Sequence, residues 1–275
     1  MGAVPEPRLT KLAGLLPDWE VDAQAAYDAR VNGTPRGPVT GFRHLDEELG
    51  HALQPGLHFV HGGPGVGKTA LALQIATSCG TPALYVSAEM GLLELFRRHT
   101  ARVTRTFLGR LKSGELTPSE SLDLARQAAA AAPLLALADA TRAYAHPGWI
   151  RDKAEAVRGE GPYLLVVIDS IHSWAEGGTD AANEYEALNH GIAGLRGLAH
   201  DLNCPVLAIA EQNRASMGKG GVSAGAGSRK IEYGSETVLD LSRDDKTEAP
   251  LAGATPIKLT PVSYTHLTLP TKRIV

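Results

Sequence analysis

Residues 62–69 read Gly62-Gly63-Pro64-Gly65-Val66-Gly67-Lys68-Thr69, which is the phosphate-loop pattern G-x-x-x-x-G-K-S/T. Glycines let the backbone curl so that successive N–H groups point inward at phosphates. Lys68 supplies a compact positive charge for the β- and γ-phosphates, and Thr69 offers its hydroxyl to Mg²⁺. The eight residues therefore predict a binding site for a nucleotide and its magnesium ion.

The sequence on either side of this loop supports that interpretation. A short, largely apolar stretch at 57–61 precedes the loop, and the helix-forming residues 70–76 follow it. Strand, glycine loop and helix is the order that a phosphate loop requires, and the helix adds the positive end of its dipole to the anion site. The alternative is a glycine-rich turn with a chance Lys-Thr pair, which this context disfavours.

Composition places the chain among ordinary globular proteins. It has 275 residues, with 43% hydrophobic and 21% charged, which suits one large α/β domain with small additions. The formal net charge of −3 provides no general attraction for nucleic acid, so any such binding needs a local basic patch. We interpret Cys79 and Cys204 as buried thiols in a reducing compartment. The absence of an 18-residue apolar run or a signal peptide in the sequence predicts a cytoplasmic protein without membrane contact.

Apolar runs alternate with helical stretches along most of the chain. We expect strands at 57–61, 82–87, 163–168, 205–210, 236–242 and 256–260, and helices at 67–79, 90–104, 117–131, 147–158 and 184–202. Alternation of nearly continuous apolar strands with helices predicts an α/β fold whose mainly parallel central sheet has helices on both faces.

We divide the chain into three parts. Residues 1–39 are an N-terminal extension with a short helix at 18–31, N-capped by Asp18, and a turn-rich linker. Residues 40–260 form the compact domain. Residues 261–275 look like translated sequencing-adapter read-through and are taken as a probable non-native tail, with a genuine divergent tail as the alternative.

A second chemical signature ends the apolar run Leu164–Ile168. Asp169 follows this run directly, so it should lie at the C-terminal edge of a buried strand. Ligands bind outside that edge in open α/β sheets, and an acid there can hold the Mg²⁺ shell beside Thr69. The alternative is an ordinary strand followed by an Asp-Ser turn.

A third carboxylate, Glu89, comes just after the expected strand at 82–87. If this strand neighbours the strand before the phosphate loop, Glu89 can reach the γ-phosphate and orient or deprotonate the attacking water. The alternative is an N-terminal helix residue that the helix dipole stabilises.

Four segments resemble one family of proteins. Residues 40–46 look like the "TGF-x-x-LD" entry of RecA-like ATPases, and residues 87–90 resemble the S-x-E-M segment of DnaB-type hexameric replicative helicases. Residues 205–214 resemble the strand of that family that ends in a Q-x-N-R sensor, and residues 228–239 are similar to its "G-x-I-E-x-x-A-D-V-V-L" segment. The resemblance covers residues 40–260 approximately, in the family's order.

This resemblance implies a function and roles for particular residues. It implies a RecA-like P-loop ATPase domain that hydrolyses Mg-ATP at the subunit interfaces of a hexameric ring and moves along single-stranded DNA during replication. Lys68 and Thr69 would bind ATP and Mg²⁺, Glu89 would be the catalytic base, and Asp169 would be the metal-shell acid. We assign the γ-phosphate sensor to Gln212, although a gapless alignment places Glu211 at the family's glutamine.

The segment 213–230 is the expected contact with DNA. It is rich in Gly, Ser and Ala, lacks acidic residues and carries the basic residues Arg214, Lys219, Arg229 and Lys230. A basic loop without aromatic side chains suits contact with a phosphate backbone rather than base stacking. The alternative is a solvated loop without a ligand.

Two other functions stay open at this point. One is a RecA- or KaiC-like recombination or regulatory ATPase without unwinding activity, and the other is a nucleotide-gated DNA-binding or loading module with negligible turnover. Because only residues 1–39 precede the compact domain, we do not expect primase or loader contacts through a separate helical domain. If the tail is not native, the chain lacks a basic trans-acting finger and should hydrolyse ATP slowly.

Overall fold

The computed structural model describes residues 9–178, 183–211, 234–244 and 257–264. The chain divides into two compact units, Met1–Arg36 and Gly37–Val275. The first contains a short 3₁₀ helix, η1 (Leu12–Leu15), and helix α1 (Leu16–Asn32). The predicted cap at Asp18 is wrong, because a proline at the start of the helix moves the N-cap to Leu15 and leaves Asp18 in the first turn. None of the side chains of α1 is buried.

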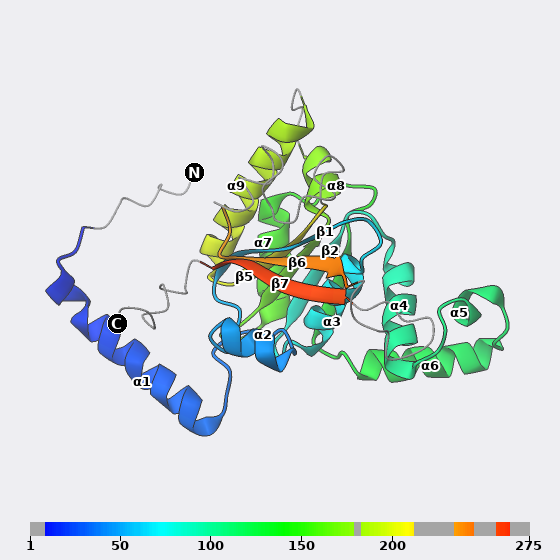
Figure 1. The fold of residues 1–275 in the computed structure, drawn as a ribbon, viewed down its shortest axis with the longest axis horizontal. Helices are drawn as coiled ribbons and strands as arrows, with labels where there is room; N and C mark the ends of the chain where they lie inside the picture. The colour runs from blue at the N-terminus through cyan, green and yellow to red at the C-terminus, as the bar shows by residue number, and fades with distance from the viewer. Residues whose placement is uncertain (1–8, 179–182, 212–233, 245–256, 265–275) are drawn as a thin grey trace. The chain divides into compact units, whose positions relative to one another are not determined.

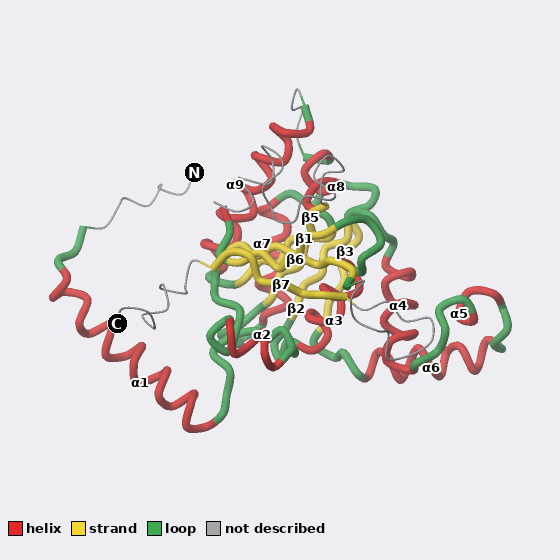
Figure 2. The backbone as a smooth tube through the Cα atoms, viewed as in Figure 1, coloured by secondary structure: helices red, strands yellow, loops and turns green. Residues whose placement is uncertain are grey.

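The second unit is built on one seven-stranded sheet with the order β3-β2-β4-β5-β1-β6-β7 (Figures 1 and 2). Neighbouring strands from β3 to β6 are parallel, and β7 is antiparallel to β6. The strands are β1 (Gly56–Gly62), β2 (Ala83–Ser87), β3 (Leu135–Asp139), β4 (Leu165–Asp169), β5 (Pro205–Glu211), β6 (Thr237–Arg243) and β7 (Ile257–Tyr264).

Helices connect these strands and cover both faces of the sheet. They are α2 (Arg43–Glu48), α3 (Lys68–Ser78), α4 (Leu92–Thr104), α5 (Arg110–Ser113), α6 (Pro118–Ala130), α7 (Pro147–Arg158), α8 (Ile171–Glu176) and α9 (Glu184–Leu202). Buried side chains of α7, α8 and α9 form one core with the sheet, and those of α3 and α4 form the other. The predicted α/β fold is therefore confirmed.

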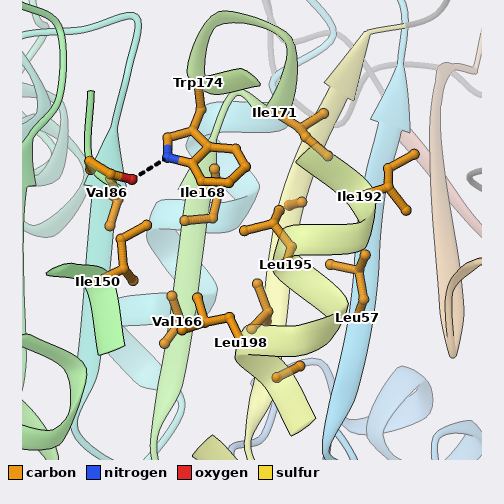
Figure 3. Close-up of a cluster of buried hydrophobic side chains, with 14 of the residues drawn as sticks. Leu57, Val86, Ile150, Val166, Ile168, Ile171, Trp174, Ile192, Leu195 and Leu198 are labelled. Carbon is orange, nitrogen blue, oxygen red and sulfur yellow. Dashed lines mark hydrogen bonds between the residues drawn. The ribbon is translucent and has the colours of Figure 1, made fainter. Parts of the chain in front are cut away.

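The first core shows how local sequence fixes these helices. Trp174 of α8 lies with Ile171, Ile192 and Leu195 against the sheet (Figure 3), and its indole N–H donates a hydrogen bond of 2.8 Å to the carbonyl of Ala145. Such a bond allows a Trp to be fully buried without losing its polar partner. These contacts place α8 directly behind the end of β4.

The predicted elements match the observed ones to within two residues at each end, except that β7 continues to Tyr264. The sequence analysis missed α2, α5, α8 and the edge strand β3. Strand β3 reads Leu-Ala-Leu-Ala-Asp, and alanine has a low preference for strands, so its sequence resembles the end of the preceding helix.

Candidate nucleotide-binding site

The glycine loop lies between the C-terminal end of β1 and the first turn of α3. Gly67 is the N-cap of α3 with a φ of 99°, a conformation that side chains disfavour. Gly62 allows a close approach to β6, since a Cβ there would lie 2.5 Å from the carbonyl oxygen of Leu241. The loop therefore needs glycine at both positions, and the predicted strand–loop–helix unit of residues 62–69 is present.

Lys68 opens α3 and turns back onto the loop. Its ammonium group donates hydrogen bonds of 2.9 and 3.0 Å to the carbonyls of Gly62 and Gly63. The Nζ atom also lies 3.8 Å from Oε1 of Glu211 at the end of β5, and the Lys68 side chain is 8% exposed. A buried ammonium needs acceptors and a counter-charge, and these three groups provide them.

Asp169 ends β4 and is almost completely buried. Its Oδ2 accepts a hydrogen bond of 2.6 Å from the hydroxyl of Tyr85, whereas the buried Oδ1 has no hydrogen-bond partner among the described residues. Burial raises the pKa of the Asp169 carboxyl, and interactions with Tyr85, Thr69 and Lys68 oppose that rise. The carboxylate is thus held between the phosphate loop and β2.

These features fit a magnesium ion. An unpartnered buried carboxylate oxygen is the type of ligand that Mg²⁺ prefers. The side chain of Thr69 is close enough to lower the pKa of the same carboxyl group. The predicted pair of Thr69 and Asp169 is therefore brought together at one edge of the sheet.

Glu89 reaches this edge by a different route from the one considered above. The condition that its strand neighbours the phosphate-loop strand is not met, because β2 pairs with β3 and β4, whereas β1 pairs with β5 and β6. The carboxylate instead accepts hydrogen bonds from Ser170 and, at 3.1 Å, from Ser173. Its charge also raises the pKa of Asp169, which places it in the same group of acids.

The alternative role of Glu89 as an N-terminal helix residue has little support. Helix α4 begins at Leu92 with Gly91 as its N-cap, and its first-turn acid is Glu94. Glu89 precedes that cap and bonds to side chains at the start of α8 instead.

Two residues at this edge were missed as site residues. Glu211 contacts Lys68. The sequence feature that could have identified it is its position, which the gapless alignment matches to the family's sensor glutamine. Burial lowers the pKa of His172 in α8. The nearby negative charges oppose this fall; they belong to Glu184, Glu211, Glu89 and Glu176. The remaining predicted site residues, Gln212, Arg214, Lys219, Arg229 and Lys230, lie outside the described residues.

The described part of the chain has no helix that is both long and apolar enough to cross a membrane.

Comparison with known proteins relates this site to one family. The family described as "DnaB-like helicase C terminal domain" matches residues 37–258. The replicative DNA helicase DnaB of Geobacillus stearothermophilus is 26% identical over 235 residues, 79% of this chain and 49% of that protein. The replicative DNA helicase DnaB of Synechocystis sp. is 29% identical over 185 residues, 65% of this chain and 21% of that protein. The chain spans about half or less of the length of these relatives.

Solved structures agree on the fold. A DnaB-like replicative helicase, described together with its interactions with primase, has a TM-score of 0.72 at 17% identity and covers 93% of this chain and 65% of its own. A KaiC-like protein from Pyrococcus horikoshii has a TM-score of 0.53 at 19% identity, over 82% of this chain and 86% of its own. At these identities the likeness concerns the fold alone, which is RecA-like.

Proposed function

Because the chain belongs to the family of DnaB-like helicase C-terminal domains, we propose that it is the ATPase domain of a ring-forming replicative DNA helicase. The observation that carries this proposal is the meeting of three groups at one sheet edge. The ammonium of Lys68 lies on the glycine loop, the buried Asp169 has a free carboxylate oxygen, and the carboxylate of Glu89 is fixed by two serines.

In the proposed site the loop residues 62–69 bind the phosphates of ATP. The backbone N–H groups of the loop and the start of α3 face the phosphates, and Lys68, which the carbonyls of Gly62 and Gly63 hold on the loop, contacts the phosphate oxygens. Thr69 and Asp169 hold Mg²⁺, which neutralises charge on the β- and γ-phosphates when bound.

Glu89 is the proposed group that acts on the attacking water. Its side chain is exposed at the sheet edge, and the hydroxyls of Ser170 and Ser173 fix one of its oxygens. The other oxygen can accept a proton from a water in line with the γ-phosphate. Gln212, one residue beyond β5, is the proposed sensor of that phosphate.

We further propose that the basic residues of 213–230, Arg214, Lys219, Arg229 and Lys230, contact single-stranded DNA, and that subunits assemble as a hexamer in the cytoplasm.

The test combines nucleotide binding, phosphate release and strand displacement. Lys68→Ala should abolish tight ATP binding at little cost in melting temperature, and the exposed Lys153→Ala is the matched control. ATP hydrolysis that rises with single-stranded DNA, together with strand displacement, is the expected result. Hydrolysis without strand displacement would favour the recombination or regulatory ATPase. Unchanged ATP affinity in Lys68→Ala would disprove the nucleotide site.

A further inference from the structure

Glu211 lies beside the phosphate loop because of the strand register. It is the last residue of β5, and it is paired with Gly62, the first residue of the loop, in the parallel ladder between β5 and β1. Its Oε1 lies 3.8 Å from Lys68 Nζ. Of the carboxylates in the described residues, only that of Glu211 lies within ion-pair distance of Lys68.

The two partners differ in exposure. The side chain of Lys68 is 8% exposed, and that of Glu211 is 53% exposed. The ammonium is therefore fixed by its loop carbonyls, while the carboxylate can turn into solvent at small cost. An incoming phosphate group would meet Lys68 in place and would need to displace only the glutamate.

We propose that Glu211 is an internal counterion that competes with the nucleotide phosphates for Lys68 and thereby limits the affinity for ATP. This inference rests on the proposed nucleotide site. Both competitors are anions, and the lysine cannot give its full charge to both at once. A glutamine at this position would carry no charge and would not compete.

The surrounding charges strengthen this effect. Glu211 ends β5, Asp169 ends the neighbouring parallel strand β4, and Glu89 accepts a hydrogen bond from Ser170, so the three carboxylates lie at one edge of the sheet. Each phosphate added to the nucleotide brings more negative charge toward them. The competition should therefore weaken ATP binding more than ADP binding, because the γ-phosphate is the additional anion.

The experiment measures binding of a non-hydrolysable ATP analogue and of ADP, in magnesium, by the full chain. Glu211→Gln removes the charge and keeps the shape, so it should bind the ATP analogue about two- to fivefold more tightly than the unaltered chain and gain less for ADP. The gain should shrink as salt is raised, which a purely structural role would not produce. Glu155→Gln, on the exposed surface of α7, is the matched control for net charge.

The outcomes separate this inference from the proposed function. If the unaltered chain binds the ATP analogue through Lys68 but Glu211→Gln does no better than Glu155→Gln, Glu211 is not a competitor and the nucleotide site stands. If Glu211→Gln binds the analogue and the unaltered chain does not, the inference is supported in its strongest form. If no variant binds nucleotide, both proposals fail.

Discussion

The hydroxyl of Tyr85 donates a hydrogen bond of 2.6 Å to Oδ2 of Asp169, and both side chains are buried. The bond joins β2 to β4 on the side of the sheet that faces α3. Burial raises the pKa of Tyr85 well above its ordinary value, so the phenol keeps its proton at neutral pH and remains a donor. The bond thus directs one oxygen of Asp169 into the protein and leaves the other for a ligand.

Tyr85→Phe should weaken magnesium-dependent nucleotide binding at acidic pH. Burial raises the pKa of Asp169 and the tyrosine opposes that rise, so loss of the hydroxyl raises this pKa further. Because Mg²⁺ needs the ionised carboxylate, affinity falls as pH drops through the pKa of Asp169, and this fall should begin at a higher pH in the variant. The measurement is ATP affinity against pH in magnesium, with the exposed Tyr27→Phe as control. Identical pH profiles would contradict the role of Tyr85.

Glu89→Gln should keep nucleotide affinity and lower hydrolysis by about 10²-fold or more, the scale of a lost general base. The amide oxygen can still accept bonds from Ser170 and Ser173, so the geometry is preserved while the charge is removed. The measurement is the rate of phosphate release, with Glu155→Gln as the control. Unaltered turnover would leave Glu89 as a partner of α8 without a role in the reaction.

The double change Arg229→Ala and Lys230→Ala should weaken the binding of single-stranded DNA, whatever the base sequence of that DNA. If both residues contact phosphates, the slope of log affinity against log salt should fall in magnitude by about 1.4, or about 0.7 for each lost contact. A fluorescent oligonucleotide titrated at several salt concentrations measures that slope. The paired Arg126 on α6 gives a control substitution that leaves the 213–230 segment intact.

Local sequence could predict the elements of this fold because each depends on nearby residues. The glycine loop, the apolar run before Asp169 and the helix periodicities all carry signals over short distances. The order of strands depends on which faces pack together, so local sequence could not settle whether β2 neighbours β1, and β4 and β5 in fact lie between them. Glu89 therefore reaches the site through the start of α8.

The contact between Glu211 and Lys68 illustrates a second limit. It joins residues far apart in the chain, and it exists because the register of β5 against β1 ends at Gly62. A one-residue shift of register would turn the glutamate to the other face of the sheet. The sequence shows Glu211 as a departure from the family's pattern, whereas the strand pairing shows that its partner is the ammonium of Lys68.

Gly62→Ala should destabilise the domain and remove nucleotide binding together. The added methyl group would lie 2.5 Å from the carbonyl oxygen of Leu241 and 3.0 Å from Val66, so either β6 or the loop must move. We expect a loss of about 1–3 kcal/mol of stability, as for an overpacked site. Gly197→Ala is the matched control, since a Cβ on this exposed residue of α9 meets no atom within 4 Å among the described residues and should raise stability by about 0.5–1 kcal/mol. Urea unfolding and titration with an ATP analogue measure both effects. If Gly62→Ala were as stable as the unaltered chain and bound ATP equally well, the close approach of β1 to β6 would not be what requires glycine at the start of the loop.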